Sequence, residues 1–170
     1  NTIYDFRDRA IDITSTGSTG WTISNNSLYN GNVSAHVNYP ASSELHGIRI
    51  LGGPGYAVLN NYIGGNAALA TGTNAAYTST LGNIGYQGIL LTTTSASPTS
   101  SIKGNTIANI SINYAPVSSS INAFTGIETS GSGISIGGSS AGDGNVVGSI
   151  VATGSIVVST ATTSSTYTSI

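Results

Sequence analysis

The sequence contains no cysteine and no methionine. The absence of cysteine excludes disulfide bonds and thiolate metal sites as the basis of the fold. Charged residues make up only 6% of the 170 residues, against about 25% in an ordinary soluble domain. Four Lys and Arg against six Asp and Glu leave no basic stripe for a phosphate backbone, so we predict no nucleic-acid partner. No apolar run approaches the ~20 residues of a membrane helix, so we predict no membrane insertion.

The low charge does not indicate a disordered chain. Disordered segments usually combine low hydrophobicity with high net charge, whereas this chain is 38% hydrophobic with a net charge of -2. Its length is that of one domain with a core of its own. Because the chain opens on Asn1-Thr2-Ile3 without an initiator methionine or a signal peptide, we expect residues 1–170 to be one segment of a longer chain. Residues 160–170 are expected to be a loose or truncated tail.

Two short motifs alternate along the chain. The first is a small residue, an aliphatic residue, a variable residue and usually a second aliphatic residue, with spacings of 37, 41 and 38 residues. The second is an asparagine corner between aliphatic residues, with spacings of 35, 44 and 40 residues. Self-similarity of this kind is typical of solenoids and other repeat folds. The first motif covers 10–13, 47–50, 88–91 and 126–129, and the second is centred on Asn26, Asn61, Asn105 and Asn145.

Each repeat is interpreted as one coil of a β-solenoid. Alternation of aliphatic and small polar residues is the period-2 pattern of half-buried strands, and Gly, Asn and Ser suit the corners between them. One unit is a strand, a Ser/Thr/Gly turn, a second strand, an asparagine corner, a third short strand and a longer loop. The pattern predicts an all-β chain folded as a right-handed parallel β-helix of about four coils, with long loops on one side.

Stacking explains the composition. Equivalent positions of successive coils lie about 4.8 Å apart, so like charges would repel, whereas amides, hydroxyls and aliphatic chains can stack on themselves. We therefore predict that Asn26, Asn61, Asn105 and Asn145 turn inward and form a structural ladder at one corner.

The recurrent Gly-Ile-x-Ile and Asn-Asn-x-Ile or Gly-Asn-x-Ile motifs resemble the pectate-lyase-like parallel β-helix superfamily, in particular large secreted and surface proteins of bacteria. The resemblance spans residues from about 3 to 158. It implies the fold but no single activity, because one fold hosts many functions. Polygalacturonase-like members show paired aspartates, a Gly-His-Gly and an Arg-x-Lys, and of these the chain has only the fragment His46-Gly47.

The sequence predicts no catalytic residues, no metal site and no cofactor. Aligning the repeats places Asp12, Arg49, Leu90 and Glu128 at one ladder position, so Asp12 and Arg49 are expected to be neighbours in successive coils. This pair has two interpretations, an outward-facing ion pair or a lyase-type base at Arg49.

The loops after the third strands, about 29–46, 64–87 and 108–125, are expected on one side of the stack and carry aromatic residues. Insertions on one face of a solenoid often form its binding face, and aromatic rings beside Asn and Ser suit sugars. The alternative is that these rings cap the hydrophobic core beneath the loops. The candidate binding residues are Tyr39, Tyr77, Tyr86, Tyr114 and Phe124.

The function predicted from these features is a structural or adhesive module of an exported cell-surface protein, with weak glycan binding through the aromatic loops. The location is therefore expected to be extracellular or at the cell surface. The expected partners are the remainder of a longer parent chain or a neighbouring protein that caps the coil ends, with a glycan as candidate ligand. The competing function is a polysaccharide-active lyase or glycoside hydrolase whose site is incomplete in this segment.

Overall fold

The computed structural model describes residues 1–15, 17–32, 39–40, 43–114, 121–149 and 155–160. It consists almost entirely of short β-strands joined by tight turns, with a short 3-10 helix, η2 (Ala68–Ala70). The strands form four sheets, which we call A to D. Sheet A contains β1 (Thr2–Tyr4), β4 (Ser27–Tyr29), β7 (Tyr62–Ile63), β11 (Thr106–Ile107) and β15 (Val146–Val147); sheet B contains β2 (Arg9–Ile13), β5 (Ser43–Leu51), β9 (Ile84–Thr92) and β13 (Phe124–Ser130); sheet C contains β3 (Thr22–Ser24), β6 (Ala57–Leu59), β10 (Ser100–Lys103) and β14 (Ile134–Ile136); sheet D contains β8 (Ala75–Ser79), β12 (Ile110–Tyr114) and β16 (Ile156–Thr160).

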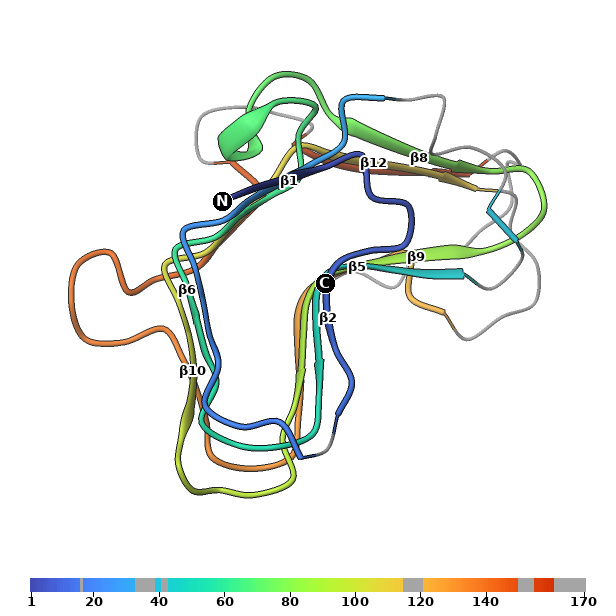
Figure 1. Ribbon diagram of the computed structural model, residues 1–170. Helices are drawn as coiled ribbons and strands as arrows, with labels where there is room; N and C mark the ends of the chain where they lie inside the picture. The colour runs from blue at the N-terminus through green and yellow to red at the C-terminus, as the bar shows by residue number, and fades with distance from the viewer. Residues whose placement is uncertain (16, 33–38, 41–42, 115–120, 150–154, 161–170) are drawn as a thin grey trace.

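The four sheets are all parallel, and neighbours within a sheet come from successive repeats of the sequence. Parallel neighbours need a long crossover connection, and here each crossover passes through the other sheets. The chain is therefore a parallel β-solenoid, which confirms the predicted fold class; it makes about three turns rather than about four. Viewed along the stack, successive coils superimpose, with β6 and β10 along one arm and β2 and β5 along another (Figure 1).

Sheet D corrects the prediction that the third strand of each unit is followed by an irregular loop. Strands β8 and β12 lie inside the expected loops 64–87 and 108–125. Their residues alternate between buried and partly exposed positions, as in Ala75-Ala76-Tyr77 and Ile110-Ser111-Ile112. This period-2 pattern belongs to a half-buried strand. Each full coil thus has four strands, and the buried rings of sheet D form part of the core. Most of the predicted tail, 161–170, lies outside the described residues, and Thr160 is the last residue of β16.

Aliphatic side chains at equivalent positions form columns through the interior. Strand register aligns three such columns, and their members in the middle coils are fully buried. A contiguous column of this kind continues the hydrophobic core from coil to coil. The columns are Ile23, Val58, Ile102 and Ile136; Ile3, Leu28, Ile63, Ile107 and Val147; and Ile11, Ile48, Ile89 and Ile127.

The predicted corner asparagines lie in one buried column between sheets C and A. The side-chain amide of Asn26 donates to Asn61 Oδ1 at 2.9 Å, that of Asn61 to Asn105 Oδ1 at 2.9 Å, and that of Asn105 to Asn145 Oδ1 at 2.8 Å. The backbone N–H of each donor residue reaches the same oxygen. Asn1 extends the column by donating to Asn26 Oδ1 at 3.2 Å. We call this column the asparagine ladder.

Each rung of the ladder also holds the coil before it. The second hydrogen of each amide bonds a backbone carbonyl, so the donor and acceptor groups of a buried amide are both satisfied, as buried polar groups require. The residues before Asn26, Asn61 and Asn105 sit at tight corners. These residues, Asn25, Asn60 and Gly104, have φ near +60°. The carbonyl bonds are Asn61 to Ile23, Asn105 to Val58 and Asn145 to Ile102, each at 2.9 Å.

Strands β5 and β9 change direction sharply in their middle (Figure 1), and glycines occupy the bend. A methyl group at Gly88 would lie 2.6 Å from the Gly126 carbonyl oxygen and 2.7 Å from Ile107 Cδ1, and one at Gly47 would meet Gly88 and Ile63 in the same way. The small residue of the first sequence motif is thus needed because the aliphatic column of sheet A packs directly against the bent backbone.

Candidate functional site

Five of the ten charged residues lie in strands of sheet B: Arg9, Asp12, Glu44, Arg49 and Glu128. Strand register places Asp12 beside Arg49, Arg49 beside Leu90, and Leu90 beside Glu128. The predicted ladder position of these residues is therefore confirmed. A second outer column contains Arg9, His46, Gln87 and Thr125. Polar groups that are distant in the sequence thus converge on the surface of the bend.

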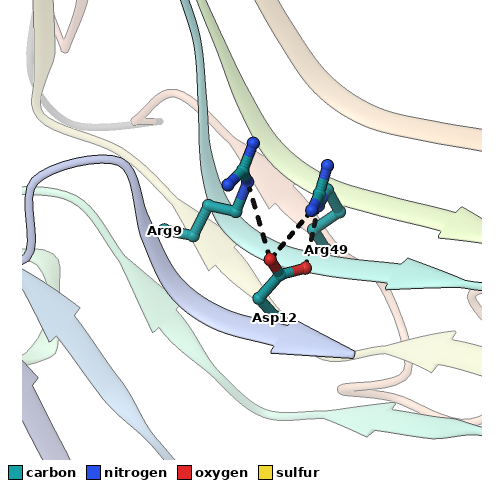
Figure 2. A network of polar contacts seen from close by, with 3 residues as sticks. All are labelled: Arg9, Asp12 and Arg49. Carbon is teal, nitrogen blue, oxygen red and sulfur yellow. Dashed lines mark hydrogen bonds and ion pairs between the residues drawn. The ribbon is translucent and has the colours of Figure 1, made fainter. Parts of the chain in front are cut away.

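Asp12 and Arg49 form a two-pronged ion pair between successive coils. Arg49 Nε and Nη2 each lie 2.8 Å from a different carboxylate oxygen of Asp12, and Arg9 Nε lies 3.7 Å from the same carboxylate (Figure 2). The hydrogen bonds from Arg49 hold the pKa of Asp12 below its usual value, and the same bonds raise the pKa of Arg49. An arginine can act as a general base only if its pKa is lowered toward the working pH. The pKa of Arg49 is raised instead, so this geometry favours the ion-pair interpretation of Arg49. Because both groups are partly exposed, the pair contributes only about 0.5–1 kcal/mol.

His46 is buried beside this pair, with 1% of its surface exposed. Neither ring nitrogen makes a hydrogen bond within the described residues. Burial lowers the pKa of His46, and the positive charges of Arg49 and Arg9 lower it further. The neighbouring Gln87 amide and Glu44 carboxylate act in the opposite direction and are outweighed. The imidazole is therefore held in its neutral form between two guanidinium groups.

A recess of about 200 Å³ crosses the bend next to His46. Residues before the bend (Glu44, Gly85 and Gln87) and after it (Glu128) line the same recess, together with Ile121 and Asn122. Gln87 Nε2 donates to Glu128 Oε2 at 2.7 Å, while the buried Gln87 Oε1 has no hydrogen-bond partner among the described residues. We call this recess the bend groove. It presents the carboxylates of Glu44 and Glu128 to a ligand that can donate hydrogen bonds.

A second, more open recess adjoins the bend groove through Glu44. It is about 480 Å³ in volume and is lined by Arg7, Asp8, Arg9, Pro40 and Ser43 as well as Glu44. The two recesses together give a polar surface of both charge signs across successive coils. Of the residues that line the two recesses, the alignment of the repeats predicts a position only for Glu128, and Gln87 and Asn122 stand in segments expected to be loops. Extending the alignment of the first motif by one residue toward the N-terminus places Gln87 beside His46.

The candidate binding aromatics do not form an exposed surface. Tyr39, Tyr77 and Tyr86 are almost fully buried, and Tyr114 and Phe124 are partly buried against the core. The Tyr77 and Tyr86 ring centroids are 5.0 Å apart, and Tyr86 stacks on Phe124 at 6.5 Å. These positions correspond to the alternative in which the rings cap the core, because sheet D folds over them. The placement therefore does not support an aromatic binding face at these five residues.

Among the residues that the structure describes, no cluster of three or more His, Asp or Glu has the arrangement of a metal site. In the same part of the chain, the helical structure is too short to span a membrane. No family model matches the chain, no curated protein matches it, and no solved structure matches it. The site must therefore be interpreted from its own chemistry.

We expect the buried His46 to make the protein less stable as the pH falls below 6.5, the usual pKa of histidine. The unfolded chain binds a proton near that pH, whereas the folded chain resists protonation down to its lower pKa. Stability is therefore fully present above 6.5 and is lost as the pH falls toward the folded pKa. Urea unfolding of the protein and of His46→Gln, from about pH 7.5 to about pH 5, measures the effect.

As the pH falls through this interval, the unfolding free energy of His46→Gln should rise relative to that of the unaltered protein by up to about 1.4 kcal/mol per pH unit. All other residues are the same in both proteins, so the difference between them isolates position 46. A difference in unfolding free energy that does not change with pH would contradict the neutral, buried state of His46. Asp12 acts at lower pH, because its contribution is present above 3.8 and is lost only as the pH falls toward its lowered pKa.

Proposed function

We propose that this chain is a structural and adhesive β-solenoid module of an exported cell-surface protein. The observation that carries the proposal is the asparagine ladder, which runs through every coil from Asn1 to Asn145 as an unbroken series of side-chain hydrogen bonds. Such a ladder serves rigidity along the stack and contributes nothing to chemistry at a surface. The resemblance to surface proteins of the pectate-lyase-like superfamily supports the same role.

The low charge also supports a scaffold role. Positions that stack on themselves favour amides, hydroxyls and aliphatic chains over charges, and half of the ten charged residues line the bend groove or the recess beside it. The partners consistent with this role are further coils, or a neighbouring protein, that cover the ends of the stack.

The adhesive part of the proposal is weak binding of a neutral, hydroxyl-rich glycan in the bend groove. The carboxylates of Glu44 and Glu128 accept hydrogen bonds from sugar hydroxyls, and the groove spans successive coils, as an extended glycan would. The groove replaces the aromatic loops as the candidate contact surface, because the loop rings are in the core. Few aromatic contacts and an open surface favour low affinity.

Glycan-array and calorimetric measurements on the full chain test this proposal. Binding of neutral polysaccharides should be lost in the double variant Gln87→Ala, Glu128→Ala and retained in Asn113→Ala, which removes an amide from an exposed position of β12. Equal binding by the two variants would exclude the bend groove.

The competing function is a polysaccharide lyase or glycoside hydrolase, and the observation in its favour is the buried, neutral His46 beside the carboxylates of the groove. Incubation with uronic-acid polysaccharides, with and without Ca²⁺, separates the two functions. Formation of an unsaturated product that absorbs in the ultraviolet would overturn the scaffold proposal.

A further inference from the structure

Beside the bend groove, three buried polar atoms have no hydrogen-bond partner among the described residues. They are Nδ1 and Nε2 of His46 and Oε1 of Gln87. Strand register places His46 of β5 directly beside Gln87 of β9. Because buried polar groups are almost always hydrogen-bonded, each of these two side chains supplies the partner that the other lacks.

Glu128 fixes the orientation of the Gln87 amide. Gln87 Nε2 donates to Glu128 Oε2 at 2.7 Å, and a carboxylate only accepts hydrogen bonds. The amide nitrogen is therefore held toward Glu128, and the amide oxygen lies on the buried side. A neutral imidazole carries one N–H donor, which suits this oxygen. His46, Gln87 and Glu128 thus form a chain of side chains that crosses three successive coils and ends in the groove.

The charged groups around His46 come from β2 and from β5 itself. They are Arg9 and Asp12 on β2, and Glu44 and Arg49 on β5. Asp12 is already bound by Arg49 through two hydrogen bonds. Among the described residues, Glu44 is therefore the carboxylate left to compensate a positive charge on His46. Glu44 stands two residues before His46, on the same face of the strand, and it also lines the bend groove.

We propose that His46 is the positioning residue of the bend groove, and that the groove loses its ligand when His46 takes up a proton. In its neutral form His46 donates to Gln87 Oε1, which holds Glu128 in place and leaves Glu44 to accept hydrogen bonds from a glycan. A proton gives the ring a second N–H donor and a buried charge that needs a partner. The imidazolium then binds Glu44 and withdraws it from the ligand.

The position of His46 sets the direction of this response. Burial and the two guanidinium groups lower the pKa of His46, so the ring is neutral at pH 7 and the groove is in its binding form. Proton binding and glycan binding oppose each other. By linkage, a bound glycan lowers the affinity of His46 for a proton by the same factor by which protonation weakens glycan binding. This inference rests on the glycan-binding role proposed above and adds its regulation by pH.

Nuclear magnetic resonance of the full chain without ligand tests the link between His46 and the groove. The ring of His46 and the side-chain amide of Gln87 are followed from about pH 7.5 to about pH 4.5, while circular dichroism monitors the fold. We expect the Gln87 amide to respond with the midpoint of the His46 ring, and this response to vanish in His46→Gln. Gln87→Leu and Glu44→Gln should each lower the pKa of His46, since each removes a group that favours the protonated ring. Asn113→Leu, at an exposed position of β12, should leave it unchanged.

Calorimetric titration with cellohexaose, a neutral probe, tests the consequence for binding. The affinity should fall about fivefold or more across the same pH interval, and the affinity of His46→Gln should not change with pH.

The inference is overturned if the Gln87 amide does not respond to His46, or if the pKa of His46 is the same in Gln87→Leu as in the unaltered protein. Unfolding before His46 takes up a proton, or equal affinity at both ends of the pH interval, would overturn it as well. Failure of cellohexaose to bind at any pH would count against the adhesive role, while the resonances of the ligand-free protein would still decide whether His46 positions Glu44 and Glu128.

Discussion

Replacing Asn61 with leucine is expected to lower the free energy of unfolding by at least about 3 kcal/mol, and the melting temperature by about 6–12 °C. Asn61 is fully buried in the middle of the asparagine ladder. Its oxygen accepts hydrogen bonds from the backbone and the side chain of Asn26, and its amide donates to Ile23 and Asn105. Leucine removes these bonds and takes the partner from Asn26 and from the Ile23 carbonyl on the preceding coil, whereas Asn105 Oδ1 keeps the bond from the backbone N–H of residue 61. Each buried group left unsatisfied costs about 1–3 kcal/mol.

The control for this experiment is Asn113→Leu, the same substitution at an exposed position of β12. Differential scanning calorimetry of both variants should show a large loss for Asn61→Leu and a change of less than about 0.5 kcal/mol for Asn113→Leu. Similar melting temperatures for the two variants would show that the ladder contributes little to stability, and would remove the main support for the scaffold role.

Replacing Gly88 with alanine should destabilise the protein by about 2–3 kcal/mol although it adds a single methyl group. Gly88 stands in the bend of β9, where the added carbon would contact the Gly126 carbonyl on one neighbouring coil and two carbons of Ile107 in sheet A. A carbonyl oxygen fixed in a sheet cannot move aside as a flexible side chain can. The strain must therefore separate β9 from β13 or push Ile107 out of its column.

Gly144→Ala provides the matched comparison, because a methyl group at Gly144 has no neighbour within 4 Å. Chemical denaturation should show little change for Gly144→Ala and a reduced midpoint for Gly88→Ala. If alanine is tolerated equally at both positions, then the close packing at the bend is not the reason why the Gly-Ile-x-Ile motif begins with a small residue.

The stacking of the coils could be predicted from the sequence because it depends on recurrence. Asn26, Asn61, Asn105 and Asn145 recur at nearly equal spacings, and each occupies a corner where a buried amide satisfies its own backbone and that of the next coil. The same hydrogen-bonding requirement applies at the corner of every coil, so asparagine recurs at the equivalent position of every repeat. The pairing of Asp12 with Arg49 followed from the same alignment.

Sheet D was not predicted, because its strands lie where the repeat length varies. The step from Asn61 to Asn105 is longer than the step from Asn26 to Asn61, and this variation in length indicates loops. The alternating burial of Ala75, Tyr77 and Ser79 is visible only once β8 is known to pair with β12. Once that pairing forms, the rings of Tyr77 and Tyr86 lie between two sheets.

The bend groove could not be predicted for a geometric reason. Its residues come from both halves of bent strands. A bend in a strand produces no periodic pattern of residues from which it could be recognised in the sequence. Glu44 and Glu128 are two coils apart in the alternation of motifs, and Gln87 joins them only because β5, β9 and β13 all turn at the same level.

The order of the hydrogen bonds in the asparagine ladder also determines how the molecule responds to mechanical load. Each coil is bonded only to the coil before it and the coil after it, as in other repeat proteins, and the described chain begins and ends on opposite coils of the stack. Tension applied through the two ends is transmitted in series through every interface between coils, and the outermost described coils yield first because they are bonded to a neighbour on one side only. Extension therefore proceeds one coil at a time, and each step releases roughly 140 Å of chain for a repeat of about forty residues. A module built in this way absorbs mechanical work in successive small steps while the rest of the stack keeps its shape.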